Sequence, residues 1–230
     1  MIRHAGAIGF LGGTFDPPHL GHLTLAHAAR TALALAEVRL VPAAAPWQKS
    51  SISPAGARAD MVALAIASEP GLVLDRTELL RGGPSYTVDT LRQLRAALGN
   101  DACVVWIIGG DQMARLDTWV QWQHLLDFCH LAVARRNDAP LALSESQRAF
   151  YVRHRAEPAA ALRRPHGQLL EVPMPPVDVA ATTLRALLAR CAETLNSDER
   201  SMLARALKPQ VLDYIGRHSL YCAAAARNQG

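Results

Sequence analysis

Cysteine and long hydrophobic runs are scarce in this 230-residue sequence. Its four cysteines lie far apart, which excludes the paired spacing of a zinc site and the dense framework of a small secreted protein. No apolar run reaches the roughly 18 residues that a membrane-spanning helix needs. The N-terminal apolar stretch continues into Thr14-Phe15-Asp16-Pro17-Pro18 without a small-residue cleavage site, so it predicts a buried strand rather than a signal peptide. We therefore expect a soluble, cytoplasmic protein with reduced thiols and no membrane partner.

Lysine is also scarce, because only Lys49 and Lys208 stand among the 24 basic residues. The formal net charge is +4 and the pI about 9.1. A charge this small on a chain this long suits anionic small molecules as well as nucleic acid, so basicity alone decides nothing. Half of the residues are hydrophobic and 19% are charged, which excludes disorder caused by low apolar content.

Short apolar runs alternate with amphipathic segments along the chain. Strands are predicted at 7–11, 38–41, 72–74, 104–108, 131–134 and 169–172, and helices at 20–35, 58–68, 87–98 and 144–154. Short helical turns are expected at 117–128, a loop at 42–56, and the region 137–167 is the hardest to assign. Alternation of this kind predicts an α/β fold with a doubly wound parallel sheet, which binds ligands at the carboxyl ends of its strands.

A small helical part is expected to complete the chain from about residue 182. Thr182 or Thr183 would be the N-cap of its first helix, Ser197 would cap the second, and Pro209 would begin the third. We predict a single domain over 1–222 that includes this helical portion, followed by a flexible tail over 223–230.

The most informative stretch is Gly12-Gly13-Thr14-Phe15-Asp16-Pro17-Pro18-His19-Leu20-Gly21-His22, at the first strand-to-helix junction. Glycines after a strand let backbone N–H groups approach a phosphate, and the helix N-terminus adds partial positive charge. His19 and His22 lie three residues apart across the helix start, so both imidazoles can face one bound group. Two other readings stand beside this anion site: a turn with incidental histidines, and a zinc site completed by His27.

This run resembles the T/H-x-G-H nucleotidyltransferase signature, and its extended form resembles the bacterial nicotinate mononucleotide adenylyltransferases. Further matching segments lie at 84–87, 108–111, 116–122, 131–136, 214–215 and 220–221. The resemblance implies a Rossmann-like nucleotidyltransferase fold and transfer of the adenylyl group of ATP to nicotinate mononucleotide, with release of pyrophosphate. It implies Mg²⁺ carried mainly by the ATP phosphates, no protein metal ligands and no nucleic-acid partner.

By resemblance, His19 and His22 contact the α- and β-phosphates and stabilise the transition state. The other residues predicted to bind ATP or its phosphates are Gly12, Gly13, Thr14, Phe15, Lys49, Gly109, Asp111, Thr182 and Arg185. Lys49 could instead be a solvated loop residue. Asp111 follows a strand and two glycines, where its carboxylate can accept hydrogen bonds from ribose hydroxyls or cap a helix.

The mononucleotide is expected to lie against three other residues. Trp119 would stack on the nicotinate ring, and Tyr86 and Thr87 would border its carboxylate; the alternative is that both aromatic residues are core. Trp122 is expected to be a packing residue. Arg135 or Arg136 would approach adenine or phosphate, or lie on the surface, and the arginines within 148–164 suggest a solvated face or an oligomer contact.

The sequence departs from the family at its second phosphate motif. Val179-Ala180-Ala181-Thr182-Thr183-Leu184-Arg185 stands where the family has a form close to Ile-Ser-Ser-Thr-x-Ile-Arg, so two serine hydroxyls are missing. Two alternative functions remain open: adenylyl or cytidylyl transfer to another phosphate, such as phosphopantetheine or glycerol phosphate, and a nucleotide-binding module without turnover. A homo-oligomer also remains open as a partner.

Overall fold

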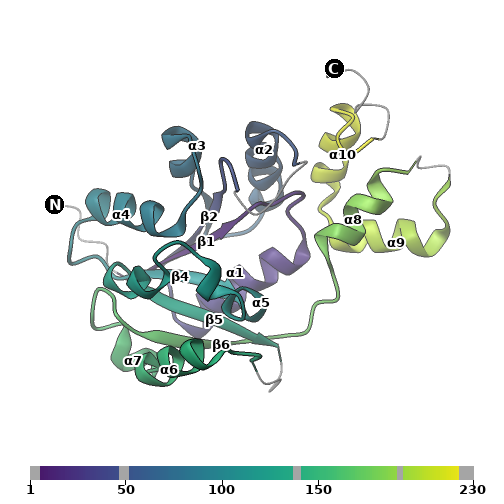
Figure 1. The fold of residues 1–230 in the computed structure, drawn as a ribbon. Helices are drawn as coiled ribbons and strands as arrows, with labels where there is room; N and C mark the ends of the chain where they lie inside the picture. Colours follow the sequence, from purple (N-terminus) through teal and green to yellow (C-terminus); the bar gives the residue numbers. More distant parts are fainter. Residues whose placement is uncertain (1–5, 47–51, 137–140, 191–193, 223–230) are drawn as a thin grey trace.

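A computed structural model describes residues 6–46, 52–136, 141–190 and 194–222 of the chain (Figure 1). Its centre is a parallel six-stranded sheet in the order β3-β2-β1-β4-β5-β6. The strands are β1 (Ile8–Gly13), β2 (Glu37–Pro42), β3 (Leu72–Leu74), β4 (Val104–Gly109), β5 (His130–Arg136) and β6 (Leu169–Met174). From β1 the chain winds outward through β2 to β3, and it then returns to β4 on the other side of β1. The β1/β4 boundary is therefore the switch point of a doubly wound sheet, as the sequence predicts.

Helices cover both faces of the sheet. They are α1 (Leu20–Ala32), α2 (Ala55–Ile66), α3 (Thr77–Arg81), α4 (Thr87–Leu98), α5 (Gly110–Met113), α6 (Glu145–His154), α7 (Pro158–Ala161), α8 (Ala181–Leu188), α9 (Ser197–Ala206) and α10 (Pro209–Arg217), with 3₁₀ turns η1 (Leu116–Thr118) and η2 (Trp122–Asp127). Neighbouring β1 residues show the division, since Leu11 packs with α1 in one core and Phe10 with α4 in the other. Strands buried on both faces explain the continuous apolar runs of the sequence.

A third core joins the C-terminal helices to α2. Leu184, Val211 and Ile215 pack with Met61 and Ala65 of α2, and Figure 1 shows α10 beside α2 with α8 and α9 below. The C-terminal part is thereby seated next to the end of the sheet at which β1 passes into α1. No helix within the described residues is long and apolar enough to cross a membrane.

The predicted helices and strands agree best with the structure where apolar residues recur regularly along the sequence. The bounds of β3 and α4 are those predicted, and the helix predicted at 144–154 is α6, with Ser144 as its N-cap. Pro209 begins α10 as predicted. The short helices α3, α5 and α7 were not predicted, because four or five residues carry too little periodicity to be recognised.

Four predicted helices have a wrong end or cap. The helix predicted at 58–68 is α2, which begins at Ala55 and ends at Ile66. The first helix ends at Ala32 rather than at residue 35, and Ala34 adopts a left-handed φ of 48°. The N-cap of α8 is Ala180, so Thr182 and Thr183 lie inside the first turn. Asn196 rather than Ser197 caps α9, because its side-chain oxygen accepts the backbone N–H of Glu199 at 2.9 Å.

Candidate active site

The candidate site begins where β1 ends, at Gly12 and Gly13. A β-carbon at Gly12 would lie 2.4 Å from Cζ2 of Trp106, and one at Gly13 would lie 3.0 Å from the ring of Phe15. Both glycines thus allow aromatic rings to pack tightly beneath the loop. Phe15 itself is buried in a left-handed backbone conformation, with φ 51°. The turn that follows β1 is therefore rigidly supported from below.

His19 and His22 meet at the start of α1. Their ring centroids lie 3.8 Å apart, and Phe15 contacts the His22 ring edge-on at 4.9 Å. A β-carbon at Gly21 would lie 3.1 Å from the His19 ring, so glycine leaves space for that imidazole. The structure confirms that both histidines share one surface at the helix N-terminus.

A backbone contact fixes the chemistry of His22. The backbone N–H of His19, the N-cap residue, donates to Nδ1 of His22 at 3.2 Å. Because Nδ1 accepts this bond, the proton of the neutral imidazole is carried by Nε2. The first turn of α1 contains no acidic residue, so the partial positive charge of the helix end is not offset there. The His22 Nε2–H and the helix end thus favour the same ligand, an anion.

The zinc interpretation required His27 to bind together with His19 and His22, but His27 does not join this pair. Its Nε2 lies 2.7 Å from the Glu69 carboxylate, whose other oxygen lies 2.6 Å from Nζ of Lys208. These contacts hold the pKa of Glu69 below its usual value, chiefly through the hydrogen bond from Lys208. Among the described residues, no group of three His, Cys, Asp or Glu side chains could hold a metal ion.

Asp111 lies across the switch point from the glycine loop. Leu11 of β1 pairs with Ile107 of β4, so the ends of the two strands are adjacent. Gly109 is the N-cap of α5, and Asp111 lies in the first turn rather than at the cap. A β-carbon at Gly109 would lie 2.5 Å from Oδ1 of Asp111, so this glycine admits the exposed carboxylate over the strand end.

Arg185 reaches the glycine loop from the C-terminal part. Its Nη1 donates to the backbone carbonyl oxygen of Asp16 at 2.8 Å, and its Nη2 lies 3.5 Å from Oγ1 of Thr182. The second phosphate motif is therefore brought to the first, although 169 residues separate the bonded positions. Thr182 is exposed in the first turn of α8.

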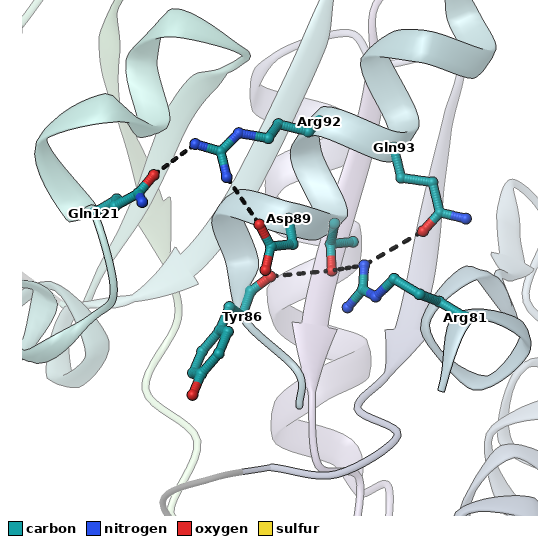
Figure 2. A network of polar contacts seen from close by, with 7 residues as sticks. Arg81, Tyr86, Asp89, Arg92, Gln93 and Gln121 are labelled. Atoms are coloured by element: carbon teal, nitrogen blue, oxygen red, sulfur yellow. Dashed lines mark hydrogen bonds and ion pairs between the residues drawn. The ribbon is translucent and has the colours of Figure 1, made fainter. Parts of the chain in front are cut away.

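The predicted mononucleotide residues belong to α4 and to the turns after it. Tyr86 is the N-cap residue of α4 and Thr87 begins the helix, and within the described residues no side chain caps this end. Arg92 donates to Asp89 at 2.8 Å and to Oε1 of Gln121 at 2.5 Å (Figure 2). Gln121 stands two residues after Trp119, so Arg92 ties the tryptophan turn to α4.

Trp119 and Trp122 differ in how deeply their side chains are buried. Trp122 is 8% exposed and packs edge-on against Phe150, which confirms its expected packing role. Trp119 and Tyr86 are only partly buried, each with one side against the core below α4. Both can therefore pack against the core and still offer surface to a ligand.

Two buried residues hold the site together and were not singled out from the sequence. Arg58 of α2 is fully buried and donates to the carbonyl oxygens of Thr14 at 2.8 Å, Ser53 at 2.9 Å and Ala43 at 2.6 Å. Its pKa is lowered by burial, against which the nearby Asp16 acts. Asp16 is 3% exposed. From the sequence, an arginine in a helix is expected to lie on the surface. Only the folded structure shows that Arg58 is buried and holds these carbonyl oxygens.

The structure describes some, but not all, of the other basic residues that the sequence singled out. Nη1 of Arg135 lies 3.1 Å from the Glu171 carboxylate on β6, which favours a structural ion pair. Arg155 bonds the same carboxylate at 3.1 Å. Lys49 lies outside the described residues, as does the side chain of Arg136.

Comparison with known proteins places this site in a family. Residues 10–172 match the family model described as cytidylyltransferase-like. The chain is 43% identical over 215 residues to a probable nicotinate-nucleotide adenylyltransferase of Bordetella petrii, covering 93% of this chain and 98% of that protein. It is 44% identical over 218 residues to the protein of the same name from Laribacter hongkongensis, covering 94% of both.

A solved structure shares the fold at low sequence identity. The Plasmodium falciparum nicotinic acid mononucleotide adenylyltransferase complexed with NaAD superposes with a TM-score of 0.69 at 16% identity, covering 94% of this chain and 97% of that one. At this identity the likeness concerns the arrangement of the sheet and helices, which it supports over nearly the whole chain.

Proposed function

Because the chain belongs to the cytidylyltransferase-like family and, within it, to the nicotinate-nucleotide adenylyltransferases, we propose that it transfers the adenylyl group of ATP to nicotinate mononucleotide. An oxygen of the mononucleotide 5′-phosphate attacks the α-phosphorus of ATP. The bond from that phosphorus to the bridging oxygen of the β-phosphate breaks, and pyrophosphate leaves with the electron pair. The products are nicotinate adenine dinucleotide and pyrophosphate.

The observation that carries this proposal is the imidazole pair at the N-terminus of α1, at the switch point of the sheet. The reaction joins two highly charged anions and builds charge on the leaving group, so its main needs are positioning and positive groups. Nε2–H of His22, the imidazole of His19 and the α1 N-terminus supply such donors for the α- and β-phosphates. The turn of Gly12, Gly13, Thr14 and Phe15 would border these phosphates.

Further ATP contacts come from the neighbouring elements. Arg185 and Thr182 of α8 would bind the triphosphate tail, and Asp111, with Gly109 giving it room, would accept hydrogen bonds from ribose hydroxyls. Lys49 would add a positive charge on the phosphates. Magnesium is expected to arrive with ATP as MgATP, since Mg²⁺ is commonly held by substrate phosphates.

Recognition of nicotinate would take place at the N-terminus of α4. Because the Tyr86 N–H already donates to the Pro84 carbonyl oxygen at 3.2 Å, the donors would be the N–H groups of the first turn of α4, which begins at Thr87 beside Tyr86. The nicotinate carboxylate is purely an acceptor, whereas a nicotinamide carries an NH₂ donor of its own. Opposing two donors in a buried site leaves one unpaired, at a cost of about 1–3 kcal/mol. Trp119 would stack on either pyridinium ring and so contribute affinity rather than choice.

The test is a panel of phosphate acceptors offered with MgATP, with pyrophosphate and dinucleotide both measured. We expect the highest kcat/KM with nicotinate mononucleotide and a lower value with nicotinamide mononucleotide. Equal values for the two would contradict the carboxylate argument. Higher activity with phosphopantetheine or glycerol phosphate, or with CTP, would assign a different transferase. ATP binding without any pyrophosphate release would identify a nucleotide-binding module.

A further inference from the structure

The C-terminal end of the described chain reaches into the loop between the glycines and the histidines. The hydroxyl of Tyr221 donates to Oδ1 of Asp16 at 2.5 Å, across 205 residues of sequence. The pKa of Tyr221 is raised, first by burial and then by this hydrogen bond, so the hydroxyl stays protonated and remains a donor. The contact lies between Phe15 and His19, inside the segment that would bind the ATP phosphates.

Asp16 is held from three sides by three separate parts of the chain. Oδ1 accepts from Tyr221, and Oδ2 accepts from the backbone N–H of Ser53 at 3.2 Å. Its backbone carbonyl oxygen accepts from Nη1 of Arg185 at 2.8 Å. Arg185 holds the backbone of Asp16 and Tyr221 holds its side chain, so this residue is fixed at both its main chain and its carboxylate.

Charge gives Asp16 a second reason to remain fixed. The guanidinium of Arg58 is fully buried, and Asp16 is the largest charge that acts to keep it ionised. Arg58 in turn holds the carbonyl oxygens of Thr14 and Ser53. The carboxylate and the guanidinium therefore hold the same segments, since both also bond the backbone of Ser53.

Tyr221 is itself held in an unusual backbone conformation. Its φ is +68° and that of Ser219 is +49°, both in the left-handed region that non-glycine residues rarely adopt. Such a conformation persists where surrounding contacts determine it. Here the contacts are the hydrogen bond to Asp16 and packing in the C-terminal core, with the Tyr221 hydroxyl 4.0 Å from Sδ of Met61.

We propose that Tyr221 is a positioning residue for adenylyl transfer, acting through Asp16 to keep His19, His22 and Arg185 aligned on the ATP phosphates. Tyr221 touches no reacting atom in this role, and the proposal rests on the proposed function of the site. It means that the C-terminal helices contribute to catalysis by fixing the β1–α1 turn as well as by adding stability.

Tyr221→Phe tests this proposal, because it retains the ring and removes the hydroxyl alone. Tyr214→Phe is the matched control: its hydroxyl also links the C-terminal part to the rest of the fold, but it donates to Asp60 of α2 at 3.2 Å rather than to the β1–α1 loop. At a temperature where both variants are fully folded, we expect Tyr221→Phe to lower kcat about tenfold, the scale of a modest misalignment of reacting groups. The KM for nicotinate mononucleotide should stay within about twofold of the wild-type value.

A second measurement does not depend on activity. The imidazole NMR resonances of His19 and His22 in the ligand-free protein should shift in Tyr221→Phe and stay unchanged in Tyr214→Phe. Equal kcat in the two variants with unmoved histidine resonances would overturn the proposal, and so would a loss of thermal stability alone. If the wild-type protein shows no transferase activity, the proposed function fails, and the resonances still decide whether Tyr221 positions the histidines.

Discussion

A single backbone hydrogen bond gives His22 two tasks. Its Nδ1 accepts the N-cap N–H of His19, which stabilises the start of α1, and this leaves Nε2–H to face a ligand. His19 donates this hydrogen bond from its main chain, and its side chain belongs to the same capping box, facing the backbone N–H of His22. Substituting either histidine should therefore affect the stability of the start of α1 as well as the activity.

We predict that His19→Ala and His22→Ala each lower kcat about 100-fold or more, the scale of losing one preorganised donor to a transition-state charge. Each substitution should also lose about 0.5–2 kcal/mol of unfolding free energy, because each side chain belongs to the capping box at the start of α1. Steady-state kinetics and urea unfolding measure the two effects. Near-normal kcat in both variants would remove the pair from the chemistry.

Arg185 is expected to carry a large share of ATP binding, because Ala180 and Ala181 stand where the family has serines. We predict that Arg185→Ala raises the KM for ATP by a larger factor than the KM for nicotinate mononucleotide. The double substitution Ala180→Ser/Ala181→Ser should lower the KM for ATP. Arg205→Ala, on exposed α9, is the control for loss of a surface charge. An unchanged ATP dependence in Arg185→Ala would show that α8 does not bind the nucleotide.

At the scale of elements, contacts with neighbouring segments hold α4 in place beside the proposed mononucleotide site. Arg92 joins α4 to the turn that carries Trp119, and Thr90 of α4 donates to the buried Glu78 of α3 at 2.6 Å. Arg81 of α3 also donates to Oγ1 of Thr90 at 3.1 Å and to Gln93 at 3.3 Å (Figure 2). These contacts fix the start of α4 relative to the aromatic residues beside it.

Trp119→Ala should therefore raise the KM for nicotinate and nicotinamide mononucleotides by similar factors and leave the KM for ATP nearly unchanged. Stacking acts on the flat pyridinium face that both substrates share. Trp122→Phe is the matched control, because that ring is buried and packs against Phe150. An effect of Trp119→Ala confined to ATP would contradict the assignment of this turn to the mononucleotide.

His130, at the start of β5, makes the stability of the outer strands depend on pH. It is fully buried, its Nε2 donates to the carbonyl oxygen of Arg164 at 2.9 Å, and its Nδ1 accepts the N–H of Gln168 at 3.2 Å. Burial is the main cause that lowers its pKa, and the charges of His166 and Arg95 act in the same direction. The unfolded chain, with an ordinary histidine pKa near 6.5, therefore takes up a proton before the folded chain does.

The unfolding free energy should consequently decrease as the pH falls below about 6.5, at up to about 1.4 kcal/mol per pH unit from this group, until the folded pKa is reached. Urea unfolding at pH 7.5, 6.5 and 5.5 measures the slope. His130→Gln should flatten it, while the exposed His124→Gln should leave it as in the wild type. Equal slopes in the wild type and His130→Gln would refute this origin.

For the whole molecule, the sequence predicts what local patterns determine. The doubly wound sheet follows from alternating apolar runs, and the histidine pair follows from glycines and a helix start within eleven residues. The sequence does not predict the long-range frame of the site. Asp16 and Tyr221 are joined across 205 residues, and Arg58 is a buried cation that donates to the carbonyl oxygens of four residues. Such contacts depend on tertiary packing, which no local period encodes.

In the proposed reaction the adenylyl group passes directly from ATP to the mononucleotide, while His19 and His22 stabilise the charge on the phosphates. The most direct test is to incubate the protein with nicotinate mononucleotide and ATP labelled at its α-phosphate. The nucleotides and the protein are then separated, and the label in each is measured. We predict that the wild-type protein moves the label into the dinucleotide one-for-one with pyrophosphate release, and that His22→Ala does so about 100-fold more slowly. Label that accumulates on the protein, or wild-type rates in His22→Ala, would contradict the claim.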